Sequence, residues 1–200
     1  MSEKQLPVIT INREYGAGGR SLAAILSEKL GIPYYDRDFI QKTVEESGYD
    51  KEDVEREGEE LSRPSRVINN ILNSTVSYKS SHDAIFEAEK QVILKLAESP
   101  CIMVGRCADR ILYEAGIDTV SIYLHAPLEM RLKRTDELGE RGDVHPEKFL
   151  EKRDSGRRNF YKQYSGCDIF DASNYTFCFD TGKVSVPLCA EMIISMLKES

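Results

Sequence analysis

The sequence is short of positive charge and lacks any long apolar run. Its 27 lysines and arginines are outnumbered by 34 acidic residues, which gives a formal net charge of −7. General nucleic-acid binders carry a basic surface, so a nucleic-acid polymer is not expected as a partner. No apolar run approaches the roughly 20 residues of a membrane span, and the start from Met1 to Pro7 is polar, unlike a signal peptide. The sequence therefore predicts a cytoplasmic protein with no membrane partner.

Cysteine and histidine patterns typical of metal sites are also missing. The five cysteines have neither CxxC spacing nor an even count, and we expect reduced, mostly buried thiols at Cys101, Cys107, Cys167, Cys178 and Cys189. The three histidines are too scattered for a metal site or a catalytic triad, and we interpret them as structural or surface residues: His82, His125 and His145.

Strand and helix patterns alternate along the 200 residues, a length that suits one domain with a small lid or insert. Short β-branched or apolar runs predict strands at 7–12, 32–36, 101–105, 120–125 and 175–180. Helical patterns cover 22–30, 39–44, 82–98, 128–138, 147–164 and 186–197, and a further helix is expected after 101–105. This alternation predicts a parallel sheet with helices on both faces.

A glycine cluster separates the first strand from the first helix. It reads Gly16-Ala17-Gly18-Gly19, with Arg13 and Arg20 on its two sides and Ser21 opening the helix. Glycines let backbone N–H groups converge on phosphate oxygens, and a helix N-terminus adds partial positive charge. A plain tight turn is the alternative, but two arginines at the first strand–helix junction favour a phosphate-binding loop.

The segment R-E-Y-G-A-G-G-R resembles the cytidylate kinase-like proteins, a divergent branch of the P-loop nucleoside monophosphate kinases. Residues 9–11 match the family's first strand and residues 27–31 the end of its first helix. Between them, Gly18 takes the second glycine of the P-loop pattern, Gly19 falls on its lysine and Arg13 on its first glycine. The P-loop lysine is therefore absent from this sequence. An arginine would have to supply its positive charge, although a guanidinium is not equivalent to an ammonium group.

The missing lysine leaves two candidates for its charge. Arg20 is the stronger one because it adjoins the helix N-terminus, and Arg13 is the alternative that reaches in from the strand. The resemblance implies ATP and Mg²⁺ as cofactors, with Ser21 as a magnesium ligand. The acid that usually ends the third strand is replaced by Val104 and Gly105, and possible substitutes are Asp36 and Asp109. The loop residues expected to bind ATP are Gly16, Ala17, Gly18, Gly19, Arg20 and Ser21.

Two further segments match motifs with which the family binds the acceptor nucleotide. Asp36, Arg37 and Lys42 lie where cytidylate kinases have an acid, a serine and an arginine, although Asp36 could simply cap a helix. Gly105-Arg106 matches the family's Gly-Arg-Asp motif, with Cys107 in place of the aspartate. An arginine directly after a buried strand is costly unless it meets an anion, so Arg106 is expected to bind the acceptor.

Arginines gather on two later helices. Arg131 and Arg134 are three apart and share a face, and Arg153, Arg157 and Arg158 follow on the next helix. A solvated basic face would explain this pattern too. In the family, this region brings arginines onto the transferring phosphoryl group, which implies catalytic roles for Arg13, Arg20, Arg131, Arg134, Arg153 and Arg157, with Arg158 on the acceptor.

The resemblance implies a single domain over 1–200 with a three-layer α/β/α sandwich and a five-stranded parallel sheet of the P-loop kinase type. A helical acceptor-side insert would cover about 45–80, and a lid about 135–160. The implied reaction is transfer of the ATP γ-phosphoryl group to CMP or dCMP. Two alternatives stay open: a nucleotide-binding module with little turnover, and a kinase for another small acceptor. The sequence leaves base specificity and oligomeric state undecided.

Overall fold

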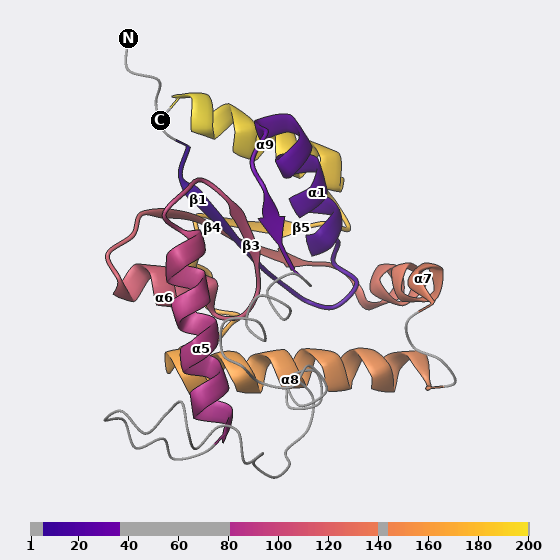
Figure 1. The fold of residues 1–200 in the computed structure, drawn as a ribbon. Helices are drawn as coiled ribbons and strands as arrows, with labels where there is room; N and C mark the ends of the chain where they lie inside the picture. The colour runs from indigo at the N-terminus through magenta and orange to yellow at the C-terminus, as the bar shows by residue number, and fades with distance from the viewer. Residues whose placement is uncertain (1–5, 37–80, 140–143, 200) are drawn as a thin grey trace. The chain divides into compact units, whose positions relative to one another are not determined.

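The computed structural model describes residues 6–36, 81–139 and 144–199 (Figure 1). The chain divides into two compact units, Met1–Tyr34 with Ser99–Ser200, and Tyr35–Glu98. The helix expected at 39–44, the insert at about 45–80, Arg37 and Lys42 all lie outside the described residues.

A five-stranded sheet has the order β2-β3-β1-β4-β5. Its strands are β1 (Val8–Arg13), β2 (Tyr34–Tyr35), β3 (Ile102–Val104), β4 (Thr119–His125) and β5 (Phe177–Asp180). Strand β1 runs parallel to both of its neighbours, with Ile9 opposite Ile102 on one side and Val120 on the other. The expected five-stranded parallel sheet is confirmed.

Strand β2 is shorter than the expected 32–36, because Pro33 has no N–H to donate to a ladder. The Pro33 carbonyl still accepts a hydrogen bond from the Ile102 amide at 2.9 Å.

Helices alternate with the strands, as expected. The first unit contains α1 (Gly19–Leu30), α6 (Ala108–Glu114), α7 (Leu128–Leu138), α8 (Pro146–Ser165) and α9 (Val186–Glu199). A short 3-10 helix, η1 (Ala172–Asn174), was not expected; the Asp171 side chain caps its N-terminus by accepting the Ser173 amide. In the second unit, α5 (Ser81–Leu96) carries a hydrogen bond from Gln91 Nε2 to Glu87 Oε1 at 2.8 Å.

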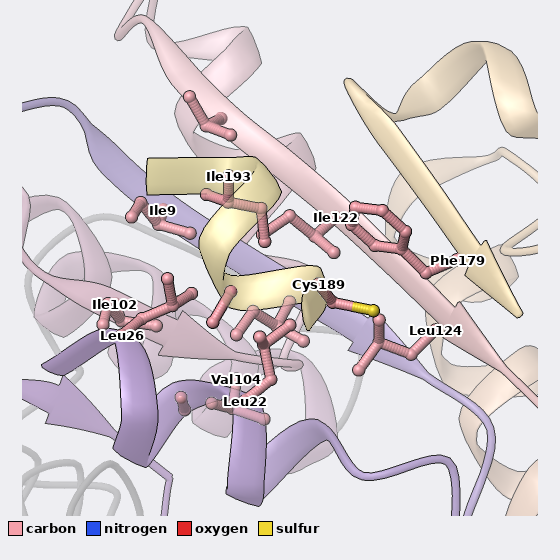
Figure 2. Close-up of a cluster of buried hydrophobic side chains, with 14 of the residues drawn as sticks. Ile9, Leu22, Leu26, Ile102, Val104, Ile122, Leu124, Phe179, Cys189 and Ile193 are labelled. Atoms are coloured by element: carbon pink, nitrogen blue, oxygen red, sulfur yellow. The ribbon is translucent and has the colours of Figure 1, made fainter. Parts of the chain in front are cut away.

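The two faces of the sheet are covered by different helices. Helices α1 and α9 pack together over one face, where fully buried side chains from both helices and three strands interlock (Figure 2). Helix α6 lies against β1 and β4 and buries Ile111 and Leu112. Burying one such side chain contributes about 1.5–3 kcal/mol. The first unit is therefore a three-layer α/β/α sandwich.

The parallel strands all end at one edge of the sheet, and ligands of open parallel sheets bind outside that edge. The segments that follow the strands there are 14–18, 105–107, 126–127 and 181–185. All five cysteines are free, and Cys101, Cys107 and Cys189 are buried. Within the ranges described above, every helix is too short or too polar to cross a bilayer.

Candidate functional site

The loop between β1 and α1 has the backbone geometry of an anion-binding turn. Gly16 and Gly18 have φ angles of 78° and 91°, in the left-handed region that favours glycine. Helix α1 begins at Gly19 with no side-chain cap. The first four N–H groups of a helix, here those of Gly18 to Ser21, have no partner within the helix, and they carry partial positive charge. An anion placed at this end of α1 would meet several convergent donors.

Each glycine of the loop is also closely approached by another part of the first unit. A Cβ at Gly16 would lie 2.8 Å from the Arg131 carbonyl oxygen of α7. A Cβ at Gly18 would lie 2.8 Å from Val186 Cγ2 of α9, and one at Gly19 would lie 3.0 Å from Arg13 Cγ. All three glycines are therefore required for packing, and Gly16 and Gly18 are required for backbone conformation as well.

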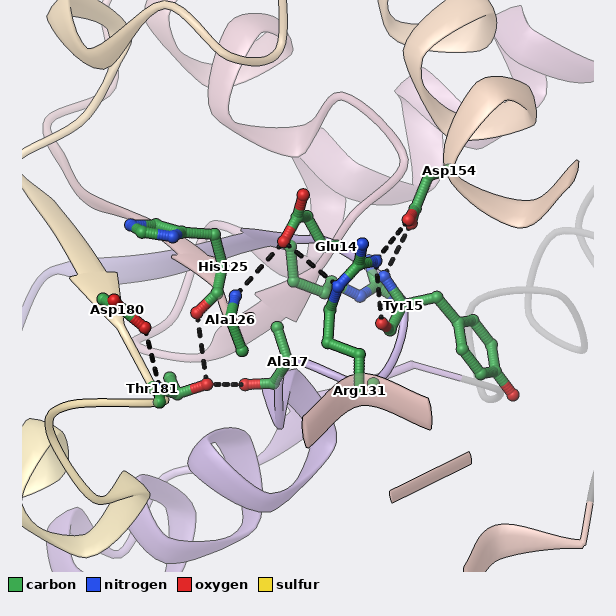
Figure 3. A network of polar contacts seen from close by, with 12 residues as sticks. Glu14, Tyr15, Ala17, His125, Ala126, Arg131, Asp154, Asp180 and Thr181 are labelled. Carbon is green, nitrogen blue, oxygen red and sulfur yellow. Dashed lines mark hydrogen bonds and ion pairs between the residues drawn. The ribbon is translucent and has the colours of Figure 1, made fainter. Parts of the chain in front are cut away.

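Arg131 of α7 binds the start of the loop (Figure 3). Its Nη1 donates to the Tyr15 carbonyl at 3.3 Å and pairs with Asp154 Oδ2 at 2.5 Å, while its Nε lies 3.4 Å from Glu14 Oε2. The Glu14 carboxylate also accepts the Ala126 amide at 3.2 Å. The Arg131 side chain is only 12% exposed, so this guanidinium is embedded between two carboxylates and the loop.

Arg134, one turn later, joins the loop to the segment after β5. Its Nη1 donates to the Gly16 carbonyl at 3.2 Å and to Thr181 Oγ1 at 2.9 Å, and its Nη2 donates to the Thr181 carbonyl at 3.1 Å. The Thr181 hydroxyl in turn donates to the Ala17 carbonyl at 2.9 Å (Figure 3). Arg131 and Arg134 thus share a face, as expected, and both bind protein acceptors.

Helix α8 contacts the same loop mainly through Tyr15. Asp154 Oδ1 accepts the Tyr15 amide at 2.7 Å, and Arg157 Nη1 donates to the Arg13 carbonyl at 3.3 Å. The guanidinium carbons of Arg153 and Arg157 lie 5.9 and 5.2 Å from the centre of the Tyr15 ring. Phe149 meets that ring edge-on at 5.2 Å.

Arg158 lies apart from these contacts. Its Nη2 pairs with Asp168 Oδ2 at 2.6 Å, and its guanidinium stacks on Phe170 at 4.9 Å. This ion pair lowers the pKa of Asp168. Arg158 is half exposed, and the structure does not bring it to the glycine loop.

The turn after β3 is strained. Gly105, Arg106 and Cys107 have successive φ angles of 82°, 58° and 55°, and a left-handed conformation costs energy in residues other than glycine. Strain of this kind is often found at functional sites, which supports a functional role for Arg106. The Arg106 guanidinium lies 5.6 Å from the centre of the Phe160 ring of α8.

Asp109 does not fit a magnesium ligand. Its carboxylate is 4% exposed and accepts the Tyr161 hydroxyl at 2.6 Å. Burial raises the pKa of Asp109 and so favours its neutral form, whereas Mg²⁺ prefers an ionised carboxylate. Asp36, the other candidate, lies directly after β2 in the second unit. No group of three potential metal-ligating side chains occurs among residues 6–36, 81–139 and 144–199.

Sequence reasoning missed four residues that shape this site: Glu14, Tyr15, Asp154 and Thr181. One signal was available, since Asp154 is an acid inside an otherwise basic helical segment and stands one turn before Arg157. Arg20 and Ser21 lie exposed on the first turn of α1. The Arg13 side chain instead lies along Gly19 and reaches Gly105.

Solved structures with the same arrangement define the class of fold. An uncharacterized protein from Eubacterium ventriosum has a TM-score of 0.68 at 21% identity, over 97% of this chain and 99% of its own. The shikimate kinase from Acinetobacter baumannii has a TM-score of 0.53 at 17% identity, over 97% of this chain and 94% of its own. The first unit and its sheet therefore have the P-loop α/β kinase fold.

Sequence comparison then identifies the family. The model of the cytidylate kinase-like family matches residues 8–183, and the chain belongs to that family. A cytidylate kinase from Thermoplasma acidophilum is 26% identical over 195 residues, which are 96% of this chain and 92% of the relative. Family membership places the chain among the nucleotide kinases, a class of phosphotransferases that use ATP and typically Mg²⁺.

Proposed function

We propose that this protein transfers the γ-phosphoryl group of ATP to CMP or dCMP. The observation that carries the proposal is the α1 N-terminus with its glycine loop, placed at the carboxyl edge of a parallel sheet and surrounded by arginines. Membership of the cytidylate kinase-like family supports the same reaction.

In this proposal the ATP phosphates bind the loop amides from Gly16 to Ser21. Arg13 supplies the positive charge of the absent lysine, since its side chain runs beside the loop, whereas Arg20 is exposed on α1. The Ser21 hydroxyl fits a magnesium ligand, and without a strand-end acid the ion would be bound mostly by phosphate oxygens and water. When bound, the ion neutralises charge on the phosphate chain.

Arginines from several elements complete the proposed site. Arg153 and Arg157 would contact the transferring phosphoryl group from α8. Arg131 and Arg134 would have their catalytic role from α7. The residues proposed to bind the acceptor nucleotide are Asp36, Arg37, Lys42, Arg106 and Arg158.

The reaction breaks the bond from the γ-phosphorus to the β–γ bridging oxygen and forms a bond to an oxygen of the acceptor phosphate. The products are ADP and a nucleoside diphosphate. No general base is needed, because the acceptor phosphate is already ionised. Charge spreads over three equatorial oxygens in the transition state, so catalysis depends on positioning and electrostatic stabilisation.

Release of ADP from Mg·ATP, measured across nucleoside monophosphates and other small acceptors, tests the proposal. CMP and dCMP should give the highest kcat/KM. ATP binding with no ADP release for any acceptor would favour the binding-module alternative. A preference for an acceptor that is not a nucleotide would favour the other alternative, a kinase for another small acceptor.

A further inference from the structure

The Arg13 side chain is enclosed by two glycines that are far apart in the sequence. A Cβ at Gly19 would lie 3.0 Å from Arg13 Cγ and 3.2 Å from its Cδ. A Cβ at Gly105 would collide with Arg13 Nη1 and would lie 3.4 Å from its Cζ. The aliphatic part of Arg13 therefore passes Gly19, and its guanidinium lies against Gly105 at the end of β3.

Backbone conformation does not explain the glycine at position 19. Gly16, Gly18 and Gly105 have left-handed φ angles, but Gly19 is the first residue of α1 and does not. Alanine is a better helix former than glycine. The close contact with Arg13 supplies a reason for glycine here, because any Cβ would crowd the arginine.

The main chain of Arg13 is fixed as well. It lies at the end of β1, in register with Leu124, and its carbonyl accepts a hydrogen bond from Arg157. With the backbone fixed and the side chain confined, the guanidinium has few alternative positions. A donor that is held in place before its ligand arrives binds more tightly, since less side-chain entropy is lost.

We propose that Gly19 and Gly105 are positioning residues that form a channel for Arg13 and direct its guanidinium to the phosphate chain of the bound nucleotide. The glycine that occupies the position of the P-loop lysine thereby makes room for the cation that replaces it. This inference rests on the proposed function, because it assumes that phosphate binds at the loop.

Gly19→Ala tests the channel without backbone strain, and a double-mutant cycle with Arg13→Ala makes the test specific. The probe is inorganic tripolyphosphate, titrated by calorimetry. Each single variant should lose about ten- to a hundredfold in affinity, as expected for a charge-assisted hydrogen bond. The double variant should be no weaker than Arg13→Ala alone, because the alanine at position 19 then has no long side chain to displace.

Gly156→Ala is the matched control. Gly156 lies within α8, and a Cβ there would meet no atom of the described part of the chain within 4 Å. This variant should bind tripolyphosphate like the wild type. Wild-type affinity in Gly19→Ala, or losses that add in the double variant, would overturn the channel while leaving the proposed function in place.

Thermal unfolding of the same variants gives a readout that needs no ligand. Gly19→Ala should raise Tm in the Arg13→Ala background, where only helix propensity counts, and should fail to raise it when Arg13 is present. An equal rise in both backgrounds would overturn the channel. If the wild-type protein binds neither tripolyphosphate nor ATP, the proposed function fails, and the direction of Arg13 toward phosphate fails with it.

Discussion

The arginines of α7 and those of α8 reach the same glycine loop through different contacts. Arg131 and Arg134 donate hydrogen bonds to loop carbonyls, and they also contact carboxylates and a threonine. Arg153 and Arg157 lie over the Tyr15 ring, and Arg157 adds a 3.3 Å hydrogen bond to the Arg13 carbonyl.

The difference matters because the two kinds of contact have unequal strengths. Hydrogen bonds that involve a charged group contribute about 1.5–3 kcal/mol, whereas an exposed cation–π contact contributes about 0.5–1 kcal/mol. We infer that α7 is part of the rigid frame of the loop. Arg153 of α8 stacks on the Tyr15 and Phe149 rings, a contact that suits it better to turn toward a bound phosphate. Asp154 is the exception on α8, since it binds both Tyr15 and Arg131.

Loss of the Arg134 guanidinium should have the largest effect. Arg134→Ala removes three hydrogen bonds and leaves the carbonyls of Gly16 and Thr181 with fewer donors. We expect a loss of about 2–3 kcal/mol in the free energy of unfolding, measured by urea denaturation. Lys133→Ala, an exposed neighbour on α7, is the control and should stay within about 0.5 kcal/mol of the wild type.

Removal of the charge on Asp154 should have an intermediate effect. Asp154→Asn keeps an oxygen that can accept the Tyr15 amide but loses the ion pair with Arg131. A loss of about 1–2 kcal/mol is expected, and it should depend little on salt because both side chains are largely buried. Asp168→Asn, which breaks the exposed pair with Arg158, should lower the free energy of unfolding by clearly less than Asp154→Asn does, because solvent screens an exposed ion pair. Equal losses in the two variants would mean that the α8–loop ion pair is no stronger than a surface pair.

The smallest stability change is expected for Arg153. Arg153→Ala removes the stacking of this side chain on Tyr15 and Phe149. The free energy of unfolding should fall by roughly 0.5–1 kcal/mol. The fall in kcat for phosphoryl transfer should be larger than the factor that this energy corresponds to. Arg153→Lys keeps the charge and serves as the partial-rescue variant. A stability loss as large as that of Arg134→Ala would contradict the distinction between the two helices.

Local patterns were sufficient to predict most of the fold. The β-branched runs located the strands, and the glycine cluster was placed correctly between the first strand and the first helix. The length of strand β2 was overestimated because Pro33 removes a donor. Helix η1 was missed because it is a single short turn, capped by Asp171 side-chain hydrogen bonds to Ser173.

The details of the site depend on contacts between distant segments, which no local pattern contains. Arg13 is confined by Gly105, which lies far from it in the sequence. Gly16 is closely approached by the backbone of α7, and Ala17 accepts from Thr181. The sequence identified arginines of the right type, and it could not tell which ones donate to the loop carbonyls and which ones stack on the Tyr15 ring.

The central claim, that the glycine loop binds the ATP phosphates, is tested most directly by amide chemical shifts during an ATP titration. The ¹H–¹⁵N resonances of Gly18, Gly19, Arg20 and Ser21 should show the largest saturable shifts, and tripolyphosphate should reproduce them. Saturable ATP binding that leaves these four amides unmoved would contradict the account.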